Sequence, residues 1–161
     1  MVAFPTDTVY GLAALPSAVE KIYAAKERPA DKQLIAMAAE PADFEALVEI
    51  SARARELMAR HWPGALTLVL PTRSGEPPTL GVRVPAHPLA LELLRAVGEP
   101  VLTTSANRSQ EPPALVAGQV RLPGVGAVLD GGPAPGGRPS TVVALEGERL
   151  RLIRVGPVDP K

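Results

Sequence analysis

The chain has 161 residues, of which 46% are hydrophobic, and its 17 basic side chains are balanced by 17 acidic ones. This length and composition fit one domain with a buried core. Because the net charge is zero, no field of the whole molecule attracts nucleic acid or a membrane surface. Any anion site therefore has to be built from a local cluster of charges.

The absence of cysteine excludes disulfides, thiolate nucleophiles and cysteine-ligated zinc. The sequence also has no apolar run of about 18 residues and no basic start followed by an apolar stretch. We therefore expect no export signal and no membrane contact. A chain without cysteine fits the reducing interior of the cell, and we predict a cytoplasmic location.

Apolar periodicity predicts the elements of the first part of the chain. Ser17 and Glu20 have the spacing of a capping box, Pro29 stands beyond the end of the helix that follows, and Pro41 suits the first position of another helix. The predicted order is a strand at 2–4, a helix at 19–26, a strand at 34–38, a helix at 41–50 and a helix at 51–60.

The second part alternates strands with one amphipathic helix. The predicted order is strands at 65–70 and 81–84, a helix at 88–97, and strands at 100–104, 127–129, 141–145 and 149–154. In the last of these strands, arginines alternate with apolar residues, so we expect the arginines to point outward. Strands interleaved with helices indicate an α/β fold, and a C-terminal hairpin indicates a mixed sheet.

Common catalytic motifs are absent from the sequence. It contains no GxxxxGK[ST] loop, no GxGxxG after a strand, no HExxH and no GxSxG. Its two histidines are too few for a convincing metal cluster, and we expect His61, beside Trp62 and Pro63, to pack at a helix end. The chemistry must come from a less familiar set of residues.

Polar residues stand at the ends of the apolar strands, where loops can gather them into one cleft. Each of them also has a structural explanation: cations near a helix C-terminus, small polar residues in turns, or arginines on exposed strands. Residue types alone leave both explanations open for Thr6, Lys26, Arg28, Lys32, Arg83, Ser105, Asn107, Ser140, Thr141 and Arg154.

Six sequence blocks follow one another along most of the chain. They are PTDTVYGL (5–12), KERPADKQL (26–34), WPGALTLVL (62–70), VRVPAHP (82–88), TTSANRS (103–109) and PSTVV (139–143). In order and spacing these blocks resemble the YrdC family, the threonylcarbamoyl-AMP synthases. Six blocks in register are far more specific than any single short motif.

The resemblance implies a twisted mixed sheet with flanking helices and a large basic concave pocket. It implies an enzyme, a nucleotidyltransferase that makes L-threonylcarbamoyladenylate and pyrophosphate from L-threonine, bicarbonate and ATP, with Mg²⁺ accompanying ATP. The product would serve N6-threonylcarbamoylation of adenosine 37 in tRNA. The implied partners are the downstream tRNA threonylcarbamoyl transferase proteins, with a possible contact to tRNA itself.

The family blocks also imply roles for individual residues. Lys26 and Arg28 would be catalytic, and no residue is expected to ligate a metal. The residues implied to bind ATP are Lys26, Arg28, Lys32, Ser105, Asn107, Ser140 and Arg154. Those implied to bind threonine are Thr6, Arg83 and Thr104. A cluster of lysines with an arginine fork suits a triphosphate, provided that it outweighs the negative end of the preceding helix.

The chain departs from the family pattern at several places. Gln110 stands where the family has glycine, so the loop changes its path if that position needs a positive φ. Gln33 replaces the usual proline, which should loosen its loop. We expect one YrdC-like domain over 1–161, with a short N-terminal edge and without the additional C-terminal domain of longer relatives.

Two other functions stay open at this point. One is a nonenzymatic RNA-binding protein that uses the same basic cleft, which the zero net charge and few aromatic residues disfavour. The other is a related enzyme of hydrogenase maturation that uses carbamoyl phosphate and ATP. That role is disfavoured because its zinc-finger-like cysteine motifs are missing here.

Overall fold

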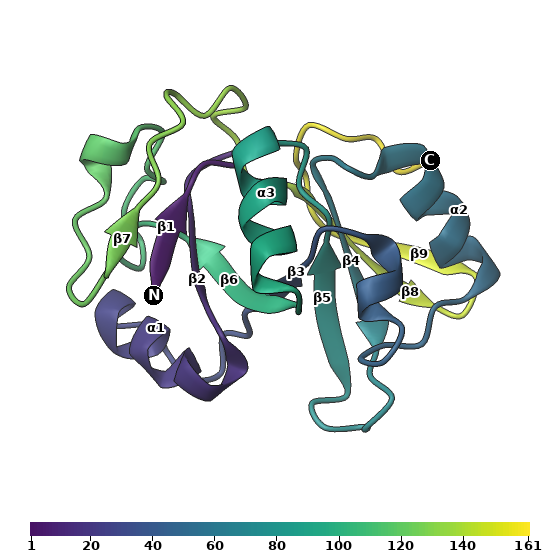
Figure 1. Cartoon of the computed structure of the whole chain (residues 1–161). Helices are drawn as coiled ribbons and strands as arrows, with labels where there is room; N and C mark the ends of the chain where they lie inside the picture. The colour runs from purple at the N-terminus through teal and green to yellow at the C-terminus, as the bar shows by residue number, and fades with distance from the viewer.

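The computed structural model describes residues 1–161 and contains one mixed sheet of nine strands (Figure 1). The elements are β1 (Val2–Phe4), β2 (Gly11–Ala14), α1 (Val19–Lys26), β3 (Ile35–Met37), α2 (Ala52–His61), β4 (Leu66–Pro71), β5 (Thr79–Arg83), α3 (Pro88–Val97), β6 (Val101–Ser105), β7 (Ala127–Val128), β8 (Thr141–Glu146) and β9 (Arg149–Arg154). Short 3₁₀ helices cover Pro16–Ala18, Pro41–Phe44 and Ala117–Gln119.

The strands lie in the order β7-β1-β2-β6-β3-β5-β4-β8-β9. The pairs β1–β7, β3–β5 and β4–β8 are parallel, and the other neighbours are antiparallel. The sheet therefore brings together strands from distant parts of the sequence. In particular, β6 lies between β2 and β3, so the blocks around residues 10, 35 and 104 become neighbours.

Alternation along the strands places adjacent residues on opposite faces of the sheet. Ala36 on β3 and Val82 on β5 belong to the core that packs against α2, together with Leu66 and Leu68 of β4. The adjacent residues Met37 and Arg83 line a cavity on the opposite face. α3 crosses the middle of the molecule, and α1 and α2 lie toward its two ends (Figure 1).

Most of the predicted elements are confirmed to within two residues at their ends, and the α/β class and the mixed sheet are confirmed as well. β2 was not predicted, because its short sequence Gly-Leu-Ala-Ala has no polar alternation: all four residues are buried. No helix of the chain is both long enough and apolar enough to cross a membrane.

The predicted helix at 41–50 is wrong. Only Pro41–Phe44 is helical, as a single 3₁₀ turn. After it, the Glu49 N–H donates to the Pro71 carbonyl at 2.9 Å, and the Arg73 N–H donates to the Leu47 carbonyl at 3.0 Å. The backbone of 47–49 is thus paired with the end of β4, although the buried Phe44 and Val48 have helical spacing.

Two local predictions are also wrong. Ser17 does not cap α1, because Pro16 begins a separate 3₁₀ turn and no side chain caps the helix. On β9, apolar residues do not all point inward: Leu152 and Ile153 are about half exposed. A bulge between Val142 and Val143 shifts the β8–β9 register and breaks the simple alternation.

Gln110 takes the conformation that glycine would take without strain. Its φ is +71°, in the left-handed region that a Cβ atom disfavours by about 1–2 kcal/mol. The loop of residues 106–111 therefore keeps a positive φ at residue 110 although glutamine replaces glycine there. The strain is in the backbone of Gln110, whose side chain is exposed.

We predict that Gln110→Gly stabilises the protein by about 0.5–1 kcal/mol. Relief of the left-handed strain exceeds the added entropy of the unfolded chain, which is about 0.5–1 kcal/mol for glycine. Urea unfolding measures this change. Gln110→Ala is the control, because it removes the side chain but keeps the Cβ atom, and it should not stabilise; equal effects of both variants would contradict this explanation.

Candidate active site

A cavity of about 240 Å³ opens on the face of the sheet opposite α2. Its wall comes from the loop between β1 and β2, from β3 and β6, and from the segment that leads into β8. Arg28, Arg83 and Arg154 all line it, and no aspartate or glutamate does. Of these three guanidinium groups, Arg83 is paired with Asp7, while Arg28 and Arg154 have no acidic partner. The cavity is therefore a local site that favours anions in a chain of zero net charge.

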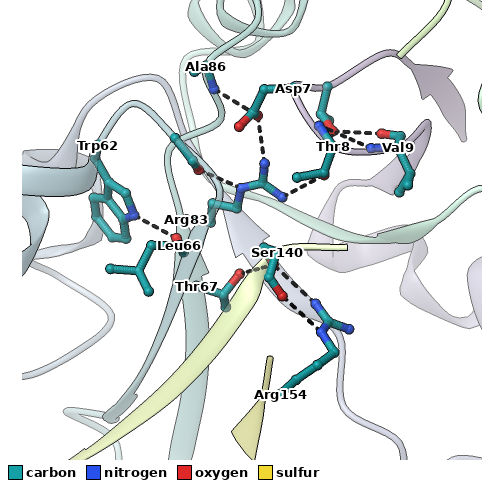
Figure 2. A network of polar contacts seen from close by, with 12 residues as sticks. Asp7, Thr8, Val9, Trp62, Leu66, Thr67, Arg83, Ala86, Ser140 and Arg154 are labelled. Atoms are coloured by element: carbon teal, nitrogen blue, oxygen red, sulfur yellow. Dashed lines mark hydrogen bonds and ion pairs between the residues drawn. The ribbon is translucent and has the colours of Figure 1, made fainter. Parts of the chain in front are cut away.

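Arg83 is held by the loop between β1 and β2 (Figure 2). Its Nη2 donates to Asp7 Oδ1 at 2.6 Å and its Nη1 to Thr8 Oγ1 at 3.1 Å, while its Nε donates to the Gly64 carbonyl at 2.9 Å. The side chains of Arg83 and Asp7 are 3% and 14% exposed. Burial lowers the pKa of Arg83, and the charge of Asp7 opposes this shift.

Thr6 forms the turn that carries Asp7. Its buried hydroxyl donates to the Val9 carbonyl at 2.6 Å and accepts the backbone N–H groups of Thr8 and Val9. Thr6 lines the cavity, but its proton is already bound within the turn. Its predicted role in binding threonine stays a prediction.

Arg28 follows the end of α1, where Glu27 adopts a left-handed conformation with φ of +51°. The Nε of Arg28 donates to the Lys32 carbonyl at 3.1 Å and its Nη2 to the Gln33 carbonyl at 2.8 Å. These bonds hold the guanidinium in the cavity wall, where burial lowers its pKa. The side chain of Lys32 is exposed and lies outside the wall.

Lys26 does not line the cavity and is buried within the protein. The residue is 1% exposed, and its ammonium donates to the backbone carbonyls of Ser105 and Asn107. Its own carbonyl accepts the Ser109 N–H at 3.2 Å. Burial, and then the charge of Arg28, lower the pKa of Lys26 to about 8. Lys26 therefore ties the end of α1 to the turn after β6, and its predicted contact with phosphates stays a prediction.

The turn after β6 divides two cavities. Thr104 and Ser105 line the cavity of the three arginines. Asn107 lines a second cavity of about 190 Å³, together with Arg108 and Arg121. Its Nδ2 donates to the carbonyls of Arg108 and Glu111, and its Oδ1 is buried without a partner.

Ser140 and Arg154 meet at the start of β8 (Figure 2). Arg154 donates from Nε to the Ser140 carbonyl at 2.9 Å and from Nη2 to Ser140 Oγ at 3.1 Å. Burial lowers the pKa of Arg154. Ser140 Oγ also lies 2.8 Å from the hydroxyl of Thr67 on β4. The neighbouring Thr141 instead binds the C-terminal segment through Val158 and Gly156.

Three residues of this site escaped the sequence analysis: Asp7, Thr8 and Thr67. A signal existed for each. Asp7 and Thr8 belong to the PTDT run, and Thr67 is the only polar residue of the apolar stretch 65–70. A buried polar residue inside an otherwise apolar strand needs a partner, and here the partner is a residue of the cavity wall.

The residues do not form a metal site of their own. No group of three or more histidine or acidic side chains comes together anywhere in the chain. Asp7, which pairs with Arg83 of the cavity wall, also accepts the Ala86 N–H. This wall, with its three guanidinium groups, suits an anionic ligand.

Comparison with known proteins identifies the family. The model of the Sua5/YciO/YrdC domain, which carries the description "Telomere recombination", matches residues 1–156. The chain belongs to the Sua5/YciO/YrdC family. A threonylcarbamoyl-AMP synthase of Bacillus subtilis is 41% identical over 98% of the chain. One from Pyrococcus abyssi is likewise 41% identical, over 97%.

Solved structures of the Sua5/YciO/YrdC family have the same fold. Pyrococcus abyssi Sua5 in complex with L-threonine aligns with a TM-score of 0.91 and 41% identity over 96% of this chain. Escherichia coli YciO aligns with a TM-score of 0.85 and 28% identity over 99% of this chain and 85% of its own. The chain spans about half the length of the Bacillus and Pyrococcus proteins, 50% in each case.

We predict that Asp7→Ala costs about 3–5 kcal/mol of unfolding free energy, because it leaves the buried guanidinium of Arg83 without its countercharge. Urea unfolding measures the loss. Glu146→Ala is the matched control: it breaks the exposed ion pair with Arg151 and should cost no more than about 1 kcal/mol. Similar costs for the two variants would contradict the structural role of Asp7.

We predict that the stability contributed by Lys26 depends on pH. Its pKa is about 8 in the folded protein and about 10.4 in an unfolded chain. Between these values the unfolded chain binds more protons, so the unfolding free energy rises with pH. Below pH about 8, burial of the charged Lys26 lowers the unfolding free energy by its full amount. This destabilisation disappears as the pH approaches about 10.4, the pKa of Lys26 in the unfolded chain.

Urea unfolding of the wild type and of Lys26→Met at several pH values measures this dependence. The difference, wild type minus variant, should increase as the pH rises from about 8 to about 10. Lys21→Met, which removes an exposed lysine from the same helix, serves as the reference for a general effect. A difference that stays flat or falls over this interval would mean that the Lys26 ammonium is not disfavoured by burial.

Proposed function

We propose that this chain carries the activity of a threonylcarbamoyl-AMP synthase. The observation that supports this most strongly is the joint occurrence of two features. Relatives of that name are about 41% identical over nearly the whole chain. In addition, the cavity has three guanidinium groups and no acid in its wall. The activity needs a site for a highly charged nucleotide, and this cavity has the right charge for one.

The substrates of the proposal are ATP, L-threonine and bicarbonate. Arg28 has an Nη1 group without a protein partner and so can bind a phosphate oxygen, as can Arg154 together with Ser140. Arg83 keeps hydrogens on both terminal nitrogens beyond those bound by Asp7 and Thr8, and these suit a carboxylate such as that of threonine. The Pyrococcus relative was solved with L-threonine, which supports this part of the proposal.

The proposed reaction has two steps. First, the neutral amine of threonine attacks CO₂ derived from bicarbonate, which forms a carbamate and releases a proton. A carbamate oxygen then attacks the α-phosphorus of ATP, and the bond to the β-phosphate oxygen breaks to release pyrophosphate. No covalent protein nucleophile is required, because holding reactants at a high effective concentration alone lowers the barrier by up to about 7–11 kcal/mol.

The residues of the cavity wall would act by orientation and by charge. The guanidinium groups are placed before the ligand arrives, and their hydrogen bonds to the protein fix their direction, so little reorganisation accompanies the development of charge on the phosphates. Lys26 would contribute by fixing the backbone of the turn at Ser105 and Asn107. Mg²⁺ belongs to the proposal as part of the MgATP substrate, where it would neutralise charge on the phosphates.

The adenylate product would be consumed by threonylcarbamoyl transferase proteins that modify adenosine 37 of tRNA. The proposed location is the cytoplasm, where ATP and tRNA are available. A direct contact of this chain with tRNA is also part of the proposal, although the zero net charge supplies no overall attraction to nucleic acid.

The decisive experiment mixes the purified chain with ATP, Mg²⁺ and bicarbonate, with or without L-threonine. Pyrophosphate is measured enzymatically and the adenylate by mass spectrometry. We expect pyrophosphate release that depends on threonine, together with threonylcarbamoyl-AMP. The absence of both from a folded protein that binds ATP would contradict the synthase activity of this chain.

Arg28→Ala tests the anion site by calorimetric titration with MgATP. Loss of a charged hydrogen bond, about 1.5–3 kcal/mol, should weaken ATP binding by roughly 10- to 150-fold. Arg95→Ala is the matched control, because Arg95 is an exposed arginine of α3 that pairs only with Glu40. Unchanged ATP affinity in Arg28→Ala would remove Arg28 from the proposed site.

A further inference from the structure

Thr67 lies behind the cavity wall and has a single polar partner. Its hydroxyl is fully buried, does not line the cavity, and lies 2.8 Å from Ser140 Oγ. Ser140 is also buried, but it does line the cavity. Arg154 Nη2 donates to the same Ser140 oxygen at 3.1 Å. Figure 2 shows the side chains of Thr67 and Arg154 converging on Ser140.

The protons of this cluster can be counted. Each hydroxyl has one proton to donate and two lone pairs to accept with. Arg154 can only donate, so one lone pair of Ser140 Oγ is occupied. Between Thr67 and Ser140, one hydroxyl must donate to the other. The donor in that pair uses its proton, and the proton of the other hydroxyl then has no acceptor within the protein.

The two arrangements differ in cost. If Ser140 donates, the proton of Thr67 stays buried without an acceptor, and no ligand can reach it, because Thr67 does not line the cavity. If Thr67 donates, the remaining proton belongs to Ser140, which lines the cavity, so a ligand there can accept it. Leaving a buried donor unsatisfied is strongly unfavourable, so the second arrangement is the stable one.

We propose that Thr67 is a positioning residue that donates its proton to Ser140 and thereby makes Ser140 a hydrogen-bond donor toward an anionic oxygen of the ligand. This inference rests on the proposed function, in which that oxygen belongs to a phosphate of ATP. With both lone pairs of Ser140 Oγ occupied, Ser140 and Arg154 present only donors to the cavity. This corner of the cavity therefore accepts an anion and rejects a ligand that offers a hydroxyl or an ammonium.

The test compares Thr67→Val, Thr67→Ser, Ser140→Ala and the double variant Thr67→Val/Ser140→Ala. Calorimetry measures the Kd for MgATP, and thermal unfolding checks that each variant is folded. Thr67→Val should weaken ATP binding by about two- to tenfold, the effect of one neutral hydrogen bond. Thr67→Ser keeps the hydroxyl and should restore wild-type affinity.

The double variant should bind ATP no more weakly than Ser140→Ala alone, because Thr67 acts only through Ser140. Thr79→Val is the matched control: Thr79 lies on β5 outside the cavity wall, and its side chain makes no hydrogen bond. This variant should leave the Kd for ATP unchanged. A purely structural role of Thr67 would lower the unfolding temperature without this selective loss and without rescue by serine.

The outcomes separate this inference from the proposed function. If the wild type makes the adenylate but Thr67→Val binds ATP as the wild type does, the role of Thr67 is wrong and the function stands. If Thr67→Val weakens ATP binding but neither the wild type nor any variant makes the adenylate, the role of Thr67 stands and the proposed synthase activity is wrong. Additive effects of Thr67→Val and Ser140→Ala, or a wild type that does not bind ATP, would overturn the inference.

Discussion

The ion pair between Asp7 and Arg83 is the constraint on which the cavity depends. It joins the loop between β1 and β2 to the end of β5, two segments 76 residues apart in the sequence. A guanidinium that is 3% exposed needs a countercharge and hydrogen-bond acceptors. Asp7, the Gly64 carbonyl and the Thr8 hydroxyl accept three of its five N–H groups. The position of the loop follows from this requirement, since no other acid is available to Arg83.

Other parts of the wall are built on the same loop. Gly137 donates its N–H to the Thr8 carbonyl at 2.9 Å, and a Cβ atom at Gly136 would come within 2.5 Å of the Asp7 carbonyl oxygen. The hydroxyl of Tyr10 donates to the Gly132 carbonyl at 2.7 Å. The irregular segment 131–137 is therefore held against the loop by close backbone contact, and it leads directly to Ser140. One buried ion pair thus sets the positions of two walls of the cavity.

The sequence was sufficient for much of the fold because most elements follow local rules. Pro88 at the first position and Gly98 after the last define α3, and Ser51 caps α2 as its residue type suggests. The helix predicted at 41–50 failed for the opposite reason. The backbone groups of residues 47–49 form hydrogen bonds with residues 71–73. A local sequence pattern cannot reveal a pairing between segments so far apart in the sequence.

The same distinction applies to the site. Of the predicted site residues, Arg28, Arg83, Arg154, Thr104, Ser105, Ser140 and Thr6 line one cavity, and Lys26, Lys32 and Asn107 do not. Where each side chain points could not be predicted, because it depends on partners distant in the sequence. Lys26 is the clearest case: whether its ammonium faces a ligand or the carbonyls of Ser105 and Asn107 is decided by how α1 packs against the end of β6.

Because Arg154 lies on β9, the two sides of the cavity wall differ in how easily they open locally. β9 is the last strand of the sheet and is bonded on one side only, with a bulge in that ladder. An edge strand separates from its sheet at a lower free energy than a central strand, because one ladder is broken instead of two. Arg83, on β5, lies between two paired neighbours. The Arg154 side of the wall can therefore detach and return while the Arg83 side stays in place.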